Sequence, residues 1–265
     1  MKNRLIKNIV DIGFDAEEGH IPSALSILDI LEVVYGKILN LDLIKKQSIN
    51  RDYFILSKGH GCLALYTILE KFKLMNKKEL ENFCSFNGKL GGHPDSTKNK
   101  FIECSTGSLG HGLPMSLGIA FGKKMQNIKG RVITLIGDGE CNEGSVWETA
   151  LLASHHNVKN LTCIIDHNKS TDRALKIDSL LKKFLAFNWD AIIVDGHDHE
   201  SIYKALKKNQ KKPLAIIANT IKGKGISFME NNPEWHHKKI DSLIKKKIYK
   251  NLKFDEKTIR KNNNK

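Results

Sequence analysis

Two strand-like runs that each end in a polar turn constrain the fold of this chain more than any other feature. The run Val132–Ile136 leads into Gly137-Asp138-Gly139, and the run Leu161–Ile165 leads into Asp166-His167-Asn168. Between the two turns there is room for one helix and a return strand. In a parallel sheet both turns then emerge at the same edge, which is where α/β proteins bind their ligands.

Strand-like and helix-like segments alternate through the rest of the chain. Further strands are expected near 190–195 and 214–219, separated by helical segments near 145–156 and 199–208. This alternation predicts an α/β fold, with a mainly parallel sheet and helices on both of its faces. Other predicted segments are helices at 23–39, at 60–73 and from about 114, loops at 87–112, and a loop followed by a helix at 170–188.

The polar turns also predict a binding site for a metal ion and a diphosphate. The carboxylate of Asp138 and the amide oxygen of Asn168 are hard ligands that suit Mg²⁺, which usually keeps phosphate oxygens as further ligands. Gly137 and Gly139 allow the backbone to approach a diphosphate closely. Two ordinary strand-to-helix turns would explain the same residues, so the turns alone leave both interpretations open.

A longer stretch around these turns resembles a known family. Residues Gly137–Glu148, taken with Asp166–Asn168, are similar to the thiamine diphosphate motif of the transketolase family. The similarity continues in the same order from about residue 1 to about residue 240, and its agreement over separate segments makes it specific. The other matching segments are Gly19-His20, Leu56–Gly61, Gly91–Pro94, Thr106–Gly112, Val194–Asp198 and Lys222–His236.

The resemblance implies a thiamine diphosphate-binding fold of the diphosphate-domain type. Asp138 and Asn168 would ligate Mg²⁺ through side-chain oxygens, and Ser170 would do so through its backbone carbonyl. Gly139 would offer its N–H to a phosphate oxygen. The other implied cofactor contacts are Gly107 and Leu109 against the aminopyrimidine ring, together with His111, Gly137 and Glu143.

Five histidines, each inside a matching segment, form a second implied group. Imidazoles are suitable because they donate or accept protons near neutral pH, while the hydroxyls and carbonyl of a sugar change protonation. The resemblance assigns His20 and His93 to the substrate channel. It assigns His60 and His236 to the diphosphate side, and all four to catalysis. His111 stands where full-length transketolases often have glutamine.

Two groups of polar residues have both a structural and a functional interpretation. Glu143 and Glu148 are suitable acids for the positive end of a helix, and the resemblance places their equivalents at a dimer interface that links two active sites. Asp195, His197 and Asp198 follow a predicted strand, where they could shape the wall of the site or cap the next helix.

The resemblance also implies a partner protein. In transketolases the glutamate that activates the aminopyrimidine lies in a second α/β domain, and the 265 residues here end before such a domain could begin. The chain therefore resembles the N-terminal subunit of a split transketolase. A separate C-terminal subunit would supply the glutamate in an α₂β₂ assembly, which would move a two-carbon ketol unit from a ketose phosphate to an aldose.

Two other functions stay open. Segments 21–23 and 169–175 differ from the usual transketolase sequence and touch the lining of the site. The same cofactor could then serve an α-keto acid decarboxylating enzyme or one similar to deoxyxylulose phosphate synthase. A function of another class is a non-catalytic subunit that binds a partner, although the intact metal-site residues and histidines favour catalysis.

Composition argues against several other classes of protein. A net charge of +14 would suit a nucleic-acid-binding protein, but scattered lysines supply nearly all of it and no nucleic-acid-binding motif accompanies them. No apolar run approaches the roughly 20 residues that a membrane span needs. Five cysteines without a CxxC pair predict reduced thiols, and hence a cytoplasmic protein.

The chain is predicted to form one thiamine diphosphate-binding domain over residues 1–240. Its first residues are basic and then apolar, but Asp11 interrupts them, so an amphipathic helix is expected there and not a signal peptide. Residues 241–265 are expected to form a lysine-rich amphipathic helix and a tail, of which 261–265 is predicted to be disordered.

Overall fold

A five-stranded sheet organises the computed structural model, which describes residues 2–254. The strands lie in the order β1-β2-β3-β5-β4, and every neighbouring pair is parallel. The central strands carry apolar, β-branched runs, the pattern of strands that are buried on both faces. The strands are β1 (Tyr53–Leu56), β2 (Val132–Gly137), β3 (Leu161–His167), β4 (Asp190–Asp195) and β5 (Leu214–Asn219).

The predicted fold class is confirmed, and β2 to β5 lie where the sequence predicts strands. Strand β1 is not predicted, because four residues are too few for periodicity to identify. The helix predicted at 23–39 divides into α2 (Ile21–Val33) and a π-helical turn, η1 (Val34–Ile38). The other α-helices are α1 (Lys2–Asp15), α3 (Leu41–Lys45), α4 (Cys62–Lys71), α5 (Lys77–Glu81), α6 (Gly112–Met125), α7 (Gly144–His155), α8 (Leu180–Ala186), α9 (His199–Lys207) and α10 (Ser242–Asn251).

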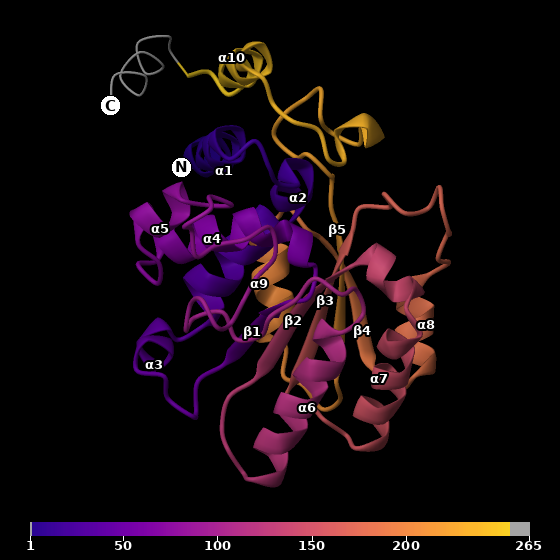
Figure 1. Ribbon diagram of the computed structural model, residues 1–265. Coiled ribbons are helices and arrows are strands. Elements are labelled where there is room, and N and C mark those ends of the chain that lie inside the picture. Colours follow the sequence, from indigo (N-terminus) through magenta and orange to yellow (C-terminus); the bar gives the residue numbers. More distant parts are fainter. Residues whose placement is uncertain (1, 255–265) are drawn as a thin grey trace.

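Helices cover both faces of the sheet (Figure 1). Because side chains alternate along a strand, neighbouring residues of β3 face opposite layers. Ile164 packs in the core shared with α1, α2, α4 and α9. Cys163 and Ile165 pack in the core shared with α6, α7 and α8. The sheet is therefore doubly covered, as the alternating pattern predicts.

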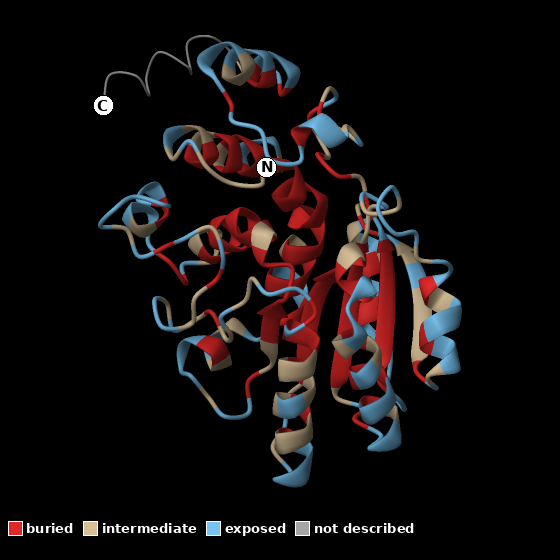
Figure 2. Ribbon diagram, turned by 45° about the vertical axis from the view of Figure 1, so that its right-hand side comes forward, coloured by how far each residue is buried: buried red, intermediate tan, exposed pale blue. Residues whose placement is uncertain are grey.

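The edge strand β4 is less covered than the centre of the sheet (Figure 2). All residues of β2 are buried, whereas none of those in β4 is fully buried. Ile193 leaves 53% of its surface exposed, although four of the six residues of β4 are apolar. Within the described residues, β4 ends the sheet and its outer edge is unpaired.

Helix α10 packs against α1 at the top of the molecule (Figure 1). Ile248 and Tyr249 are buried, the hydroxyl of Tyr249 donates to Asp11, and Lys245 lies 3.1 Å from the same carboxylate. The predicted amphipathic helix is thus confirmed, while the boundary at residue 240 stays a prediction. The tail predicted to be disordered, 261–265, lies outside the described residues.

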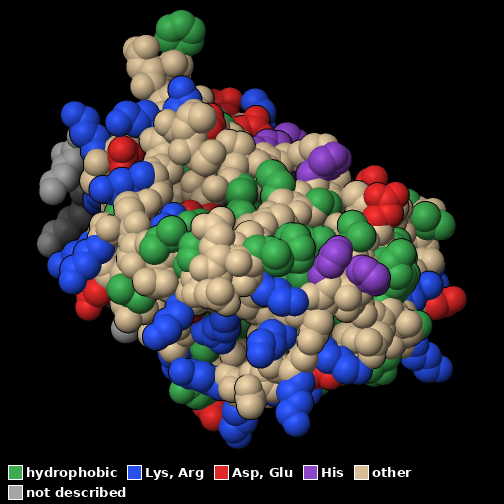
Figure 3. Space-filling model, turned by 90° about the horizontal axis from the view of Figure 1, so that it is seen from below, with side chains coloured by type: hydrophobic (Ala, Val, Ile, Leu, Met, Phe, Trp, Pro, Cys, Tyr) green, Lys and Arg blue, Asp and Glu red, His purple; other side chains and the backbone are tan. Residues whose placement is uncertain are grey.

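Basic side chains gather along one side of the face at the amino ends of the strands (Figure 3). The turns predicted to bind the cofactor lie at the opposite, carboxyl edge of the sheet. Among the described residues, no helix combines the length and the apolar character that crossing a membrane requires.

Candidate functional site

The carboxyl ends of β1, β2, β3 and β5 bring four polar turns together. Lys58 after β1 and Thr220 after β5 both donate hydrogen bonds to Asp166 at the end of β3. The backbone N–H of Lys169, after β3, donates to Asp138, after β2, at 2.5 Å. The two turns that the sequence predicts at one edge of the sheet do meet there.

Asp138 is nearly buried and held by backbone donors. Its carboxylate accepts hydrogen bonds from the N–H of Gly139 at 2.8 Å and from that of Lys169. Burial, and then the nearby charge of Asp166, raise the pKa of Asp138 above its usual value. A cation placed against the carboxylate would oppose both effects, so this environment favours a bound metal ion.

Asn168 is oriented by its neighbours. Its amide N–H donates to Asp166 at 2.9 Å, and its amide oxygen accepts from the N–H of Ser170 at 3.0 Å. Asp138 and Asn168 thus offer hard oxygens from adjacent strands, and the carbonyl of Ser170 belongs to the same turn as Asn168. By the chemistry of its donors, this set fits Mg²⁺ and does not fit a soft metal.

A buried ion pair lies next to these ligands. Asp166 is fully buried and accepts hydrogen bonds from Lys58, Thr220 and Ser26, the last at 2.8 Å. Burial alone would raise the pKa of Asp166, but Lys58 and the hydroxyl donors outweigh burial and hold this pKa below its usual value. The sequence alone indicates no role for either charge, although Lys58 lies inside the matching segment Leu56–Gly61 and Asp166 inside the matching segment Asp166–Asn168.

Four histidine rings gather at the same edge. Between centroids, the ring of His20 lies 5.4 Å from His60, 5.7 Å from His236 and 4.5 Å from His237. Burial and nearby positive charges lower the pKa of His20 to about 4 and that of His60 to about 2. Both rings are therefore neutral near pH 7. His237, which lies just outside the matching segment Lys222–His236, is also 2.8 Å from the carboxylate of Glu18.

Lys222 lies between this histidine cluster and the turn that carries the metal ligands. Its ammonium is 2.7 Å from Nδ1 of His236 and 3.5 Å from the hydroxyl of Ser170. Burial and repulsion by Lys58 lower the pKa of Lys222 to about 8. The sequence places Lys222 at the start of the last matching segment without indicating a role. A nearly buried ammonium at this position is suited to an anionic ligand such as a diphosphate.

His93 packs against two glycines that approach each other closely. A Cβ atom on Gly59 would lie 2.8 Å from the ring of His93 and 3.1 Å from the backbone of Gly107. Gly107 also has a φ of +148°, a conformation that other residues rarely adopt. The two glycines therefore let the loops around residues 91–94 and 106–112 close against the turn after β1.

Three predicted cofactor contacts lie toward the surface. His111 is exposed, and its Nδ1 is 3.0 Å from the carbonyl oxygen of Leu109, whose own surface is 38% exposed. Glu143 and Glu148 are also exposed. Within the described part of the chain, none of these side chains hydrogen-bonds to Asp138 or to the histidine cluster, so their roles stay predictions.

Glu140, for which the sequence alone indicates no role, ties the loops of the site together. It is only 1% exposed. Its carboxylate accepts hydrogen bonds from the N–H of Gly110 at 3.0 Å, the N–H of Gly137 at 2.8 Å and the hydroxyl of Ser57 at 2.5 Å. Periodicity cannot reveal a buried acid inside a polar turn, so the structure alone identifies it.

The residues after β4 are predicted either to cap the next helix or to shape the wall of the site, and the structure shows both kinds of contact. Asp198 caps α9 by accepting two backbone N–H bonds, and Asp195 accepts from the N–H of His197 at 2.8 Å. The ring of His197 instead turns inward. Its Nδ1 lies 2.8 Å from Asp29, and its Nε2 lies 2.8 Å from the backbone nitrogen of Ile221.

Comparisons with known proteins agree with this geometry. The family model described as transketolase, thiamine diphosphate binding domain, matches residues 3–260. An apulose-4-phosphate transketolase subunit from Phocaeicola vulgatus is 36% identical over 244 residues, which cover 89% of this chain and 86% of that protein. The protein of the same name from Actinobacillus succinogenes is 41% identical over 229 residues, which cover 83% of this chain and 82% of that protein.

Other relatives are longer. The transketolase of Homo sapiens is 36% identical over 256 residues, which cover 94% of this chain but 41% of that protein. The crystal structure of a transketolase from Campylobacter jejuni superposes with a TM-score of 0.85 at 28% identity, covering 96% of this chain and 42% of that one. The chain therefore spans about two-fifths of the length of these transketolases.

Proposed function

This chain belongs to the transketolase family, and on that basis we propose that it is the diphosphate-binding subunit of a two-chain transketolase. The proposed reaction transfers a two-carbon ketol unit from a ketose phosphate to an aldose. The observation that carries the proposal is that Asp138, Asn168, Lys222 and the histidine cluster lie at one edge of the sheet. The two relatives that are named as transketolase subunits support the two-chain form, because the similarity covers most of both sequences.

Residues from several turns would hold thiamine diphosphate and Mg²⁺. Asp138, Asn168 and the carbonyl of Ser170 offer oxygens to the metal ion, and Gly139 offers its N–H to a phosphate oxygen. Lys222, which is 7% exposed, adds a positive charge beside the diphosphate. When bound, thiamine diphosphate supplies the carbon nucleophile for the reaction.

The histidines handle protons and orient the ligands. Neutral His20 can accept a proton from a hydroxyl of the donor sugar as the carbon–carbon bond breaks, and we assign His93 to the same channel. His60 and His236 serve the diphosphate side. Because Lys222 donates to Nδ1 of His236, the proton of that ring lies on Nε2, which can donate to a phosphate oxygen.

A second chain completes the site in this proposal. A separate C-terminal subunit carries the glutamate that activates the aminopyrimidine, and two copies of each chain form an α₂β₂ assembly. Gly107 and Leu109 are assigned to the aminopyrimidine ring, and the exposed Glu143 and Glu148 to contacts between copies. All five cysteines have free thiols, which suits the reducing cytoplasm, where we place the assembly.

Reconstitution from separate chains tests this function. Tagged protein would be recovered from its own host together with any second chain, and the chains would be assayed apart and mixed, with Mg²⁺ and thiamine diphosphate. We expect ketol transfer from a ketose phosphate, apulose 4-phosphate among the donors tried, in the mixture only.

Three other outcomes would each contradict part of the proposal. Transfer by this chain alone would refute the need for a partner. Turnover confined to pyruvate would favour a keto acid decarboxylating or deoxyxylulose phosphate synthase-like enzyme. A complex that takes up no cofactor and turns over neither substrate class would favour a non-catalytic subunit.

A further inference from the structure

We propose that His197, held by Asp29, is a positioning residue that fixes the turn carrying Lys222 in the cofactor site. Asp29 lies on α2 and His197 follows β4, so neither belongs to the proposed ligand set. The inference rests on the proposed function only where Lys222 is assigned to the diphosphate. The positioning itself is a property of the chain without ligands.

His197 joins α2 to the turn after β5. Its side chain is 11% exposed, and its two ring nitrogens have different partners, each at 2.8 Å. The backbone N–H of Ile221 can only donate, so Nε2 of His197 must accept. The ring proton therefore lies on Nδ1 and is donated to Asp29. The network thus selects one neutral tautomer, with an acceptor aimed at the Lys222 turn.

Asp29 is held as a buried anionic acceptor. It is 1% exposed, and it also accepts hydrogen bonds from Lys2 at 2.7 Å and from His199 at 3.1 Å. Burial alone would raise the pKa of Asp29, but the hydrogen bonds from His197 and Lys2 outweigh burial and lower this pKa. The carboxylate therefore remains charged and can keep the proton of His197 on Nδ1.

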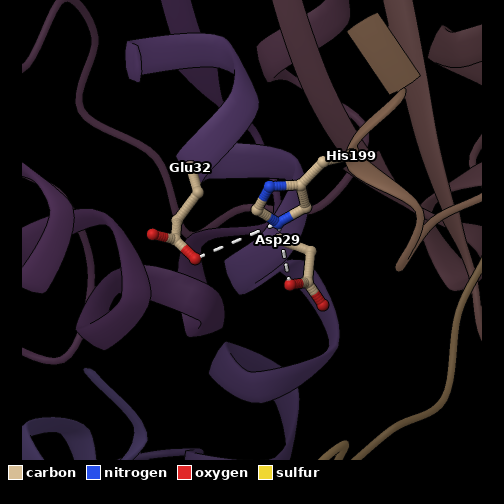
Figure 4. Close-up of side chains that lie close together, drawn as sticks. All are labelled: Asp29, Glu32 and His199. Carbon is tan, nitrogen blue, oxygen red and sulfur yellow. Dashed lines mark hydrogen bonds and ion pairs between the residues drawn. The ribbon is translucent and has the colours of Figure 1, made fainter. Parts of the chain in front are cut away.

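The surroundings of Asp29 form an ion-pair network and not a metal centre. Ligand atoms of Asp29, Glu32 and His199 lie within 4.8 Å of one another, and His199 is 4.0 Å from Glu32 (Figure 4). Lysine ammoniums already neutralise both carboxylates, Lys2 at Asp29 and Lys71 at Glu32. The network therefore holds Asp29 in place, and its charge is already balanced without a metal ion.

The hydrogen bond to Ile221 matters because the next residue is Lys222. On its other side, Thr220 is tied to the buried ion pair through its hydroxyl. Without the acceptor on His197, the N–H of Ile221 loses its partner and the backbone of Lys222 can shift. The ammonium would then leave its position 2.7 Å from His236.

Two substitutions separate this role from that of a simple structural link. In His197→Asn, the side-chain N–H₂ can replace Nδ1 and still donate to Asp29, but nothing replaces the acceptor for Ile221. In His197→Gln, the longer side chain can place its oxygen where Nε2 was, so that the N–H of Ile221 keeps an acceptor while the bond to Asp29 is lost. The two variants thus each keep one of the two bonds.

The first readout is the acetylation rate of Lys222 in the full chain without ligand, measured by brief treatment with acetic anhydride and peptide mass spectrometry. We expect Lys222 to react at least about five times faster in His197→Asn, and at nearly the wild-type rate in His197→Gln. Equal rates in all three proteins would refute the positioning role. If Lys222 were acetylated faster in His197→Gln alone, the important bond of His197 would be the one to Asp29, and its role would be to link α2 to the residues after β4.

The second readout is the Kd of thiamine diphosphate with Mg²⁺ in the assembled enzyme. We expect at least a tenfold increase in Kd for His197→Asn, which is about 1.4 kcal/mol, and less than a threefold increase for His197→Gln. An unchanged Kd in His197→Asn would overturn the inference. Lys204→Met is the control, because it removes an exposed lysine of α9 that pairs with Glu200 and leaves Asp29 and the bond from His197 to Ile221 in place, so we expect wild-type values.

Failure of the inference and failure of the proposed function give different results. If wild-type assemblies take up no thiamine diphosphate, the proposed function is wrong, while the acetylation rates still decide whether His197 positions Lys222. If the wild type binds the cofactor and His197→Asn binds it equally well, the function stands and the inference is wrong.

Discussion

Each candidate metal ligand depends on neighbours that set its charge or its orientation. Asp138 is a buried carboxylate whose oxygens are held by backbone N–H groups, and Asn168 is turned by Asp166. Asp138 is the only charged residue among the assigned metal ligands. Removing it should therefore weaken Mg²⁺ binding more than removing a neutral ligand would.

Asp138→Ala should weaken Mg²⁺-dependent binding of thiamine diphosphate by at least tenfold, or about 1.4 kcal/mol. Titration of the assembled enzyme with cofactor at several Mg²⁺ concentrations measures this effect. Asp178→Ala, which removes an exposed carboxylate from the loop between β3 and α8, is the control and should leave the affinity unchanged. Equal affinity in Asp138→Ala and the wild type would refute the metal assignment.

The sequence indicates which polar residues lie at the strand ends, but not which partners they have in the fold. Asp138, Asn168 and the histidines follow recognisable motifs. The ion pair of Lys58 and Asp166 joins residues 108 positions apart, and such partners are chosen by the fold and not by local pattern. Glu140 and His237 were not identified for the same reason.

Whole elements depend on a few buried side chains between them. The carboxylate of Glu140 holds the turn after β2, the turn after β1 and the loop that leads into α6. Helix α10 depends on apolar contacts, with Ile248 fully buried while Leu243 on the same helix is 73% exposed. Elements of this kind are predictable from periodicity, whereas β1 and η1 were too short to be identified.

Glu140→Ala should lower the free energy of unfolding by about 3 kcal/mol, because it leaves two backbone N–H groups and one hydroxyl without their buried acceptor. Urea denaturation followed by far-UV circular dichroism measures the loss. The control Glu143→Ala, at an exposed position nearby, should change the free energy by less than about 0.5 kcal/mol. Similar losses in both variants would show that Glu140 does not hold these loops.

Ile248→Ala should destabilise the chain by about 2–4 kcal/mol, since it opens a cavity between α10 and α1. Leu243→Ala, on the exposed face of the same helix, should cost less than about 0.5 kcal/mol. Thermal and urea unfolding of both variants test this. If Ile248→Ala unfolds like the wild type, α10 does not contribute to the stability of the core, which would support a domain boundary at residue 240.

Across the whole molecule, the site gathers neutral histidines in a protein that carries a net charge of +14. The pKa values of His20 and His60 lie at about 4 and about 2, far below the usual value near 6.5. The folded chain therefore resists protonation at positions that the unfolded chain protonates readily. This coupling makes the stability of the whole chain depend on pH.

The free energy of unfolding should fall as the pH falls from about 6.5 towards 4, because the unfolded state then binds protons that the folded state excludes. Each of the two histidines adds at most about 1.4 kcal/mol per pH unit to this slope. Urea unfolding of the wild type and of the double variant His20→Gln, His60→Gln between pH 4 and 7 tests the prediction. The variant should show a shallower slope, and identical slopes would contradict the lowered pKa values.

The site draws its residues from nearly the full length of the chain, from His20 on the way into α2 to His236 after β5. A ribosome adds about 5–20 residues per second, so the first histidine leaves it many seconds before the last. The turn of Lys222 also emerges late, after all five strands. If Lys222 contacts the diphosphate as proposed, no nascent fragment that lacks this turn can hold the diphosphate as the folded chain would, and cofactor loading follows the emergence of Lys222.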